Sequence, residues 1–83
     1  MSNQNPTKTL DVKGLKCPMP IVKTKKELDT LAPGEVLKVI ATDKGSVLDM
    51  QGWAKTNKAA KLLEQETVQE NGQELFVHYI ERQ

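Results

Sequence analysis

The spacing of hydrophobic residues along the chain changes period several times, and each change marks the border of a predicted element. Alternation over two residues is typical of a half-buried strand, whereas recurrence every three or four residues is typical of an amphipathic helix. The predicted elements in chain order are a strand over 10–12, a helix over 18–31, a strand over 36–42, a helix from Ser46 that frays near 57–60, and strands over 62–68 and 75–80.

This βαβαββ order predicts an α/β (α+β) fold, a two-layer sandwich with a four-stranded mixed sheet and two helices on one face. Asn71-Gly72 joins the last two strands and is a strong hairpin signal, because both residues tolerate a positive φ. Ser46 and Asp49 approximate a capping box at the start of the second helix. The residues expected to face the core are Ile21, Lys25, Leu28, Leu31 and Ala32, then Leu37, Val39 and Ala41, then Val47, Met50, Trp53 and Ala54.

The length of 83 residues allows one compact domain, which we place over 10–83 after a polar N-terminal tail over 1–9. Such a domain is too thin to enclose a deep substrate cavity, so chemistry is expected at its surface. No apolar run approaches the roughly 18 residues that span a bilayer, and the first residues lack the apolar region of a secretory signal. We therefore expect a cytoplasmic protein without a membrane partner.

The formal charge of +1 conceals an uneven distribution of charge. Between Lys8 and Lys26 six lysines accompany one acid, Asp11, whereas 64–83 contains five glutamates and Arg82. The basic stretch is either a solvated surface or a field that favours an anion and attracts an acidic partner. Cys17 lies in the middle of this stretch.

Cys17 is the chain's single cysteine, which excludes an intramolecular disulfide, a Cys-x-x-Cys redox pair and a thiolate-rich zinc site. We predict no metal and no cofactor. The single histidine, His78, lies inside the last predicted strand, where a structural or surface role is expected because a metal site needs companion ligands. A Cys–His hydrolase is unattractive, because such an enzyme also needs a cleft and oxyanion donors.

The segment Gly14-Leu15-Lys16-Cys17-Pro18-Met19-Pro20 carries the candidate chemistry. Two prolines two residues apart are tolerated in the first turn of a helix, where backbone N–H groups have no partner anyway. Cys17 is therefore expected at a helix start, where the helix dipole and Lys16 favour a thiolate. Such surroundings lower a cysteine pKa from about 8.5 to between about 3.5 and 7.5. A functional thiol and a buried structural cysteine both remain open at this point.

Three motifs resemble the small sulfur carriers typified by TusA and SirA: L-D-V-K-G-L-K-C-P-M-P from Leu10, L-x-x-L-A-P-G-E from Leu28, and A-T-D-K-G-S-V-L-D from Ala41. The resemblance implies the sandwich fold predicted above. It also implies that Cys17 accepts sulfane sulfur as a persulfide and relays it to another protein. Where the family tends to carry a Gly-His pair before its third strand, this chain has Asn57-Lys58-Ala59-Ala60.

A carrier of this kind implies two protein partners, a sulfur donor such as a cysteine desulfurase or a rhodanese-like protein, and a downstream acceptor. The destinations known for the family are tRNA thiolation, molybdenum-cofactor supply and cytoplasmic sulfur oxidation, and the sequence does not choose among them. The residues expected to support Cys17 are Pro18 and Pro20, which fix the sulfur, and Gly14, Lys16 and Lys23. We expect a sulfurtransferase-type carrier without hydrolase or redox activity of its own.

Two interpretations from other classes compete with the carrier. An RNA-binding module would explain the lysines, but Trp53, Phe76 and Tyr79 are not interleaved with them and a stable nucleic-acid complex is not expected. A regulatory interaction domain would make Cys17 structural. Asp11 and Asp43 either tune the thiol or close turns, and the turn role is favoured because short carboxylates bond nearby backbone amides.

Overall fold

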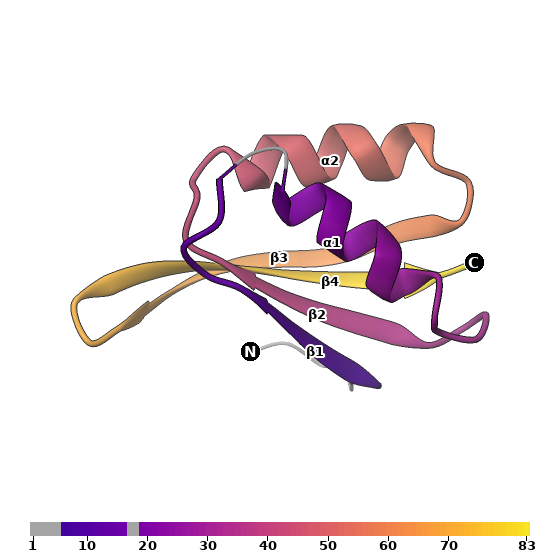
Figure 1. Cartoon of the computed structure of the whole chain (residues 1–83), viewed down its shortest axis with the longest axis horizontal. Coiled ribbons are helices and arrows are strands. Elements are labelled where there is room, and N and C mark those ends of the chain that lie inside the picture. The colour runs from indigo at the N-terminus through magenta and orange to yellow at the C-terminus, as the bar shows by residue number, and fades with distance from the viewer. Residues whose placement is uncertain (1–5, 17–18) are drawn as a thin grey trace.

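The computed structural model describes residues 6–16 and 19–83 and shows one sheet with two helices packed on one of its faces (Figure 1). The described elements are β1 (Lys8–Val12), α1 (Met19–Leu28), β2 (Val36–Ala41), α2 (Ser46–Thr56), β3 (Ala60–Glu70) and β4 (Gln73–Arg82). This is the βαβαββ sandwich that the hydrophobic pattern predicts. The prediction of fold class is therefore confirmed.

The four strands lie in the order β1-β2-β4-β3. β1 and β2 are parallel, with Leu10 opposite Val39, and α1 provides the crossover between them. β4 is antiparallel to both β2 and β3. Because β1 and β2 run in the same direction, the loops that follow them meet at one edge of the sheet, and this edge holds the candidate site.

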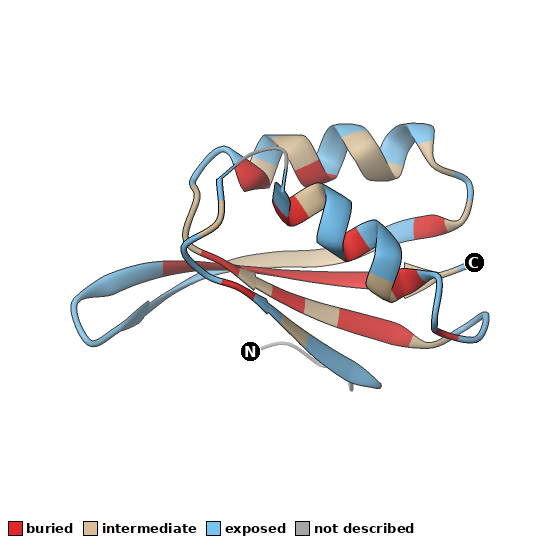
Figure 2. Cartoon of the chain, viewed as in Figure 1, coloured by how far each residue is buried: buried red, intermediate tan, exposed pale blue. Residues whose placement is uncertain are grey.

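The core lies between the sheet and the two helices, where the buried parts of β2, β4 and both helices face one another (Figure 2). Leu37 and Val39 of β2, Met50 of α2 and Ile80 of β4 are completely buried, as the alternation of β2 predicts. Shortening a buried side chain of this size to alanine typically costs about 2–5 kcal/mol, so this layer holds the helices on the sheet.

The first helix is shorter than predicted and turns a slightly different face inward. It ends at Leu28 rather than at residue 31, and its predicted start at Pro18 lies outside the described residues. Thr24 is buried, whereas Lys25 and Ala32, which the pattern assigned to the core, are exposed. Thr24 can be buried at little cost because its hydroxyl donates to the carbonyl oxygen of Pro20 at 2.6 Å, so no polar group is left unpaired.

The predicted capping box at the second helix is wrong. Gly45 occupies the N-cap position and no side chain there makes a capping hydrogen bond. Ser46 is instead the first helical residue, and its hydroxyl lies 3.0 Å from the Nε2 atom of His78 in β4. The Ser46 hydroxyl therefore bonds a residue of β4 and does not make the cap that the local sequence predicts.

Three of the described strands, β1, β3 and β4, are longer than the hydrophobic pattern indicates, whereas β2 ends one residue earlier, at Ala41. β1 begins at Lys8 rather than at residue 10, so Lys8 and Thr9, which the sequence places in the tail, pair with Leu37 and Lys38. Lys8 also forms an ion pair with Glu27 of α1. β3 and β4 extend to the turn at Asn71-Gly72, whose positive φ values of 52° and 77° confirm the predicted hairpin.

Among the described residues, no helix combines the length and the apolar character that crossing a bilayer requires.

Candidate functional site

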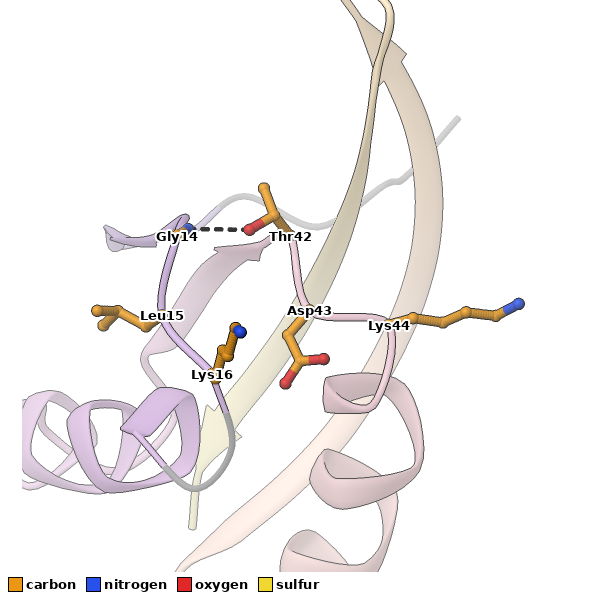
Figure 3. Close-up of a pocket in the computed structure, with 6 residues that line it drawn as sticks. All are labelled: Gly14, Leu15, Lys16, Thr42, Asp43 and Lys44. Atoms are coloured by element: carbon orange, nitrogen blue, oxygen red, sulfur yellow. Dashed lines mark hydrogen bonds between the residues drawn. The ribbon is translucent and has the colours of Figure 1, made fainter.

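The candidate site lies where the loop after β1 and the loop after β2 meet. Residues 13–16 lead from β1 toward α1, and residues 42–45 lead from β2 into α2. Between the two loops opens a pocket of about 490 Å³. Figure 3 shows the side chain of Asp43 between the loops, while that of Lys44 extends away from them. The residues that line the pocket are Gly14, Leu15, Lys16, Thr42, Asp43 and Lys44.

The loop after β1 begins as a tight turn. The amide of Leu15 donates to the carbonyl oxygen of Val12 at 3.2 Å, and Gly14 has a φ of 83°. A positive φ at the third residue of a turn is the type II pattern, which favours glycine. The Asp11 carboxylate accepts a hydrogen bond from the amide of Lys13 at 2.9 Å. Asp11 therefore closes this turn, as predicted.

In the loop after β2, as in the loop after β1, an aspartate carboxylate accepts from a backbone amide two residues later. The loop after β2 also bonds the loop after β1. The Asp43 carboxylate accepts from the amide of Gly45 at 3.1 Å, which gives Asp43 the predicted turn role. The Thr42 hydroxyl accepts from the amide of Gly14 at 2.9 Å, and this hydrogen bond joins the two loops across the pocket (Figure 3).

The predicted site residues fall into two groups. Cys17 and Pro18 lie outside the described residues, but the residues on either side of them are joined, because the amide of Met19 donates to the carbonyl oxygen of Lys16 at 2.9 Å. Pro20 is buried in the first turn of α1, the place that its missing N–H group favours. The structure therefore brings Gly14 and Lys16 to the pocket and Pro20 to the adjacent helix start.

Lys23 is exposed on α1 and does not line the pocket. Lys44 does line it, although no sequence pattern indicates this lysine. Lys16 and Asp43 both line the pocket, so groups of opposite charge border it. Among residues 6–16 and 19–83, no group of three or more metal-ligating side chains lies close enough together to hold a metal ion.

His78 lies beneath the start of α2 and is completely buried. Its Nδ1 atom is 3.0 Å from the Nε2 atom of Gln65, and this amide nitrogen also donates to the carbonyl oxygen of Val47 at 2.9 Å. Because an amide nitrogen can only donate, Nδ1 must accept, and the proton of the neutral ring sits on Nε2, from which it is donated to Ser46. Desolvation by burial lowers the pKa of His78 from 6.5 to about 4.

This arrangement gives His78 a structural role, which is one of the two roles that the sequence allowed. The ring ties β4 to the first residue of α2, and Gln65 ties β3 to the same turn. Together they fix the point at which the loop over 42–45 ends.

Thr42 is the residue that sequence analysis missed. The hydrophobic pattern predicts Thr42 at the end of a strand, and nothing in that pattern indicates a bond to Gly14, which is 28 residues away. Topology offered a signal, because right-handed crossovers bring the loops after two adjacent parallel strands to the same edge. That signal identifies the two loops but not the atoms that join them.

Comparison with known proteins agrees with this architecture. Residues 8–82 match the family model described as "Sulfurtransferase TusA". A Halobacterium salinarum protein with the provisional name of sulfur carrier protein is 49% identical over 76 residues, which cover 92% of this chain and 89% of the relative. The sulfur carrier protein TusA of Allochromatium vinosum is 54% identical over 46 residues, or 55% of this chain and 60% of that protein.

One solved structure also resembles the fold. A SirA-like protein from Desulfitobacterium hafniense superposes with a TM-score of 0.66 over 92% of this chain and 99% of its own, at 23% sequence identity. At this identity the likeness concerns the arrangement of strands and helices alone.

Proposed function

We propose, starting from the fact that this chain belongs to the TusA family of sulfur carriers, that Cys17 accepts one sulfane sulfur from a donor protein and passes it to an acceptor protein. The donor in this proposal is a cysteine desulfurase or a rhodanese-like protein, and the acceptor serves tRNA thiolation, molybdenum-cofactor supply or sulfur oxidation. A reducing cytoplasm would keep the Cys17 thiol free for this exchange.

The chemical step is a thiol exchange on a persulfide. The Cys17 thiolate attacks the outer sulfur of the donor R–S–SH, a new S–S bond forms, and the donor's S–S bond breaks. The electron pair of that bond leaves with the donor as R–S⁻, so the products are Cys17–S–SH and the donor thiolate. No external oxidant or reductant is consumed. The second transfer repeats the exchange with an acceptor thiolate as the attacking group.

The observation that carries the proposal is the position of the single cysteine in the chain. Cys17 follows Lys16, which lines the pocket, and precedes Met19, where α1 begins. A helix start presents backbone N–H groups that favour an anion. The absence of a second cysteine means that no intramolecular thiol can attack the inner sulfur and release sulfide, so the persulfide waits for a partner protein.

The supporting residues have separate roles in this proposal. Pro18 and Pro20 restrict the backbone beside the sulfur, because a proline ring fixes φ. Gly14 permits the turn that leads to Cys17. Lys16 and Lys23 attract an acidic partner and speed docking more than chemistry.

The decisive experiment is the intact mass of the protein after incubation with a cysteine desulfurase and cysteine. We expect the wild-type chain to gain one sulfur atom, the Cys17→Ser variant to gain none, and reductant to reverse the gain. Circular dichroism of both proteins provides the control for folding.

Two results would contradict the proposal. Sulfur gain by Cys17→Ser would place the acceptor elsewhere, and failure of the folded wild-type chain to gain sulfur from either donor class would remove the carrier role. Alkylation of Cys17 only after denaturation would favour the regulatory domain with a structural cysteine, and salt-sensitive RNA binding that survives Cys17→Ala would favour the RNA-binding module.

A further inference from the structure

In the described part of the chain, a side-chain hydrogen bond ties the segment that leads to Cys17 to the neighbouring loop. The Gly14 amide donates to the Thr42 hydroxyl at 2.9 Å. The other hydrogen bonds described for residues 13–16 are local: the Lys13 amide bonds Asp11, the Leu15 amide bonds Val12, and the Lys16 carbonyl oxygen accepts from Met19. Among the hydrogen bonds described for those four residues, the one to the Thr42 hydroxyl reaches a different part of the fold.

The loop that contains Thr42 begins and ends at buried residues. It follows Ala41, which is completely buried in β2 between β1 and β4. The loop ends at Ser46, which is 1% exposed and accepts the hydrogen bond from His78. The Asp43–Gly45 hydrogen bond tightens the residues between these points. These contacts hold the loop over 42–45 in place, and with it the hydroxyl of Thr42.

We propose that Thr42 is a positioning residue for sulfur transfer: its hydroxyl holds the Gly14 amide and thereby aims the segment that carries Cys17. This inference rests on the proposed function, because it concerns the geometry of the same exchange. Attack on a donor sulfur requires an aligned approach, and a small misplacement of the nucleophile lowers the rate. Without the hydroxyl, the Gly14 amide would bond to water instead and the segment would sample more conformations.

The test compares two substitutions of the same residue. Thr42→Val keeps the shape of the side chain and removes the hydroxyl, whereas Thr42→Ser keeps the hydroxyl. The matched control is Thr56→Val, because the Thr56 hydroxyl on α2 bonds only carbonyl groups of its own helix, those of Gly52 and Trp53, in the described structure. The readouts are the initial rate and the final extent of sulfur loading on Cys17 by a cysteine desulfurase.

We expect Thr42→Val to slow loading by about three- to tenfold, the equivalent of one lost hydrogen bond, with the final extent unchanged. Thr42→Ser and Thr56→Val should load at the wild-type rate. A wild-type rate for folded Thr42→Val overturns the proposal. An equally slow Thr42→Ser overturns it as well, because the hydroxyl would then not be the cause.

A second measurement on the wild-type chain keeps the inference testable even where Thr42→Val fails to fold. Hydrogen exchange followed by NMR should show the Gly14 amide protected, and exchange of this amide at the rate of an unstructured peptide overturns the proposal. The two failures are distinguishable. If the carrier function is wrong, wild-type Cys17 gains no sulfur. If only the positioning role is wrong, Cys17 is loaded at the same rate with and without the Thr42 hydroxyl.

Discussion

His78 shows how the fold sets the chemistry of a single residue. The imidazole is completely buried and both ring nitrogens have hydrogen-bond partners, Ser46 and Gln65. These partners suit the neutral ring, and burial disfavours the charged one, so the pKa falls to about 4. His78 therefore stays neutral at physiological pH and supports the start of α2 without titrating.

The lowered pKa of His78 predicts how stability changes with pH. In the unfolded chain the imidazole takes up a proton near pH 6.5, whereas in the folded chain it does so near pH 4. Between these values the unfolded state binds more protons, so the free energy of unfolding should decrease as the pH is lowered from about 6.5 to about 4, by up to about 3 kcal/mol.

Urea unfolding of the wild type and of His78→Gln over this pH window measures the effect. Carboxylates titrate in both proteins, so the difference between their unfolding free energies isolates the imidazole. We expect the unfolding free energy of the wild type to decrease toward pH 4 relative to that of His78→Gln. Parallel curves for the two proteins would show that the ring makes no such contribution.

Individual residues also show where sequence analysis reaches its limit. The burial of Leu37, Val39 and Met50 follows from spacing alone and is confirmed. The burial of Thr24 does not, because it depends on a hydroxyl that finds a carbonyl within the same helix. At the site, residue types indicated the turn at Gly14 and a helix start at Pro18 and Pro20, of which Pro18 lies outside the described residues. The bond from Gly14 to Thr42 could not be predicted in this way, because it joins two loops far apart in sequence.

At the scale of elements, the β3–β4 hairpin is set by its turn. Asn71 and Gly72 both have positive φ, which the strands on either side require of a two-residue connection. A Cβ atom at Gly72 would meet no atom within 4 Å, so a substitution there is strained by the backbone conformation and not by contacts. Gly72 therefore contributes to stability through its backbone conformation.

Gly72→Ala should lower the free energy of unfolding by about 1–2 kcal/mol, the cost of a left-handed conformation for a residue with a Cβ. Gly52 provides the matched control, because it lies within α2 and a Cβ there also meets nothing within 4 Å. Gly52→Ala should raise the unfolding free energy by about 0.5–1 kcal/mol. Chemical denaturation measures both, and a shift of the same sign in the two variants would contradict this explanation.

Elements differ in how well local sequence determines them. The second strand and the hairpin were predicted closely, because β-branched residues and Asn-Gly act locally. The predicted capping box at Ser46 does not form: Gly45 is the N-cap and the Ser46 hydroxyl bonds His78. The predicted β1 is too short because polar Lys8 and Thr9 also pair with β2. In each failure a tertiary contact outweighs local preference.

For the whole molecule, the distribution of charge relative to the fold bears on association. The six lysines between Lys8 and Lys26 lie on β1, α1 and the loop beside the pocket, whereas the five glutamates of 64–83 lie on β3 and β4. Lys8 and Lys13 have acidic neighbours, Glu27 and Asp11, within ion-pair distance. Lys16 and Lys23 are exposed, so their charges act on an approaching protein.

Reversing both charges in Lys16→Glu/Lys23→Glu should slow the second-order transfer of sulfur from the donor about tenfold at low ionic strength. The matched control is Lys55→Glu/Lys61→Glu, which makes the same charge change at exposed positions along a groove between α2 and β3, beyond the loops of the site. Rates measured at several donor concentrations separate docking from chemistry, and the limiting rate at saturating donor should be unchanged.

Salt provides the final discrimination between docking and chemistry. The screening length falls from about 10 Å at 0.1 M to about 3 Å at 1 M, so a steering effect must shrink as salt is added. The transfer rates of the wild type and of Lys16→Glu/Lys23→Glu should therefore converge toward 1 M salt. A rate deficit that persists unchanged at high salt, or an equal deficit in Lys55→Glu/Lys61→Glu, would mean that these two lysines do not steer the partner to the pocket edge.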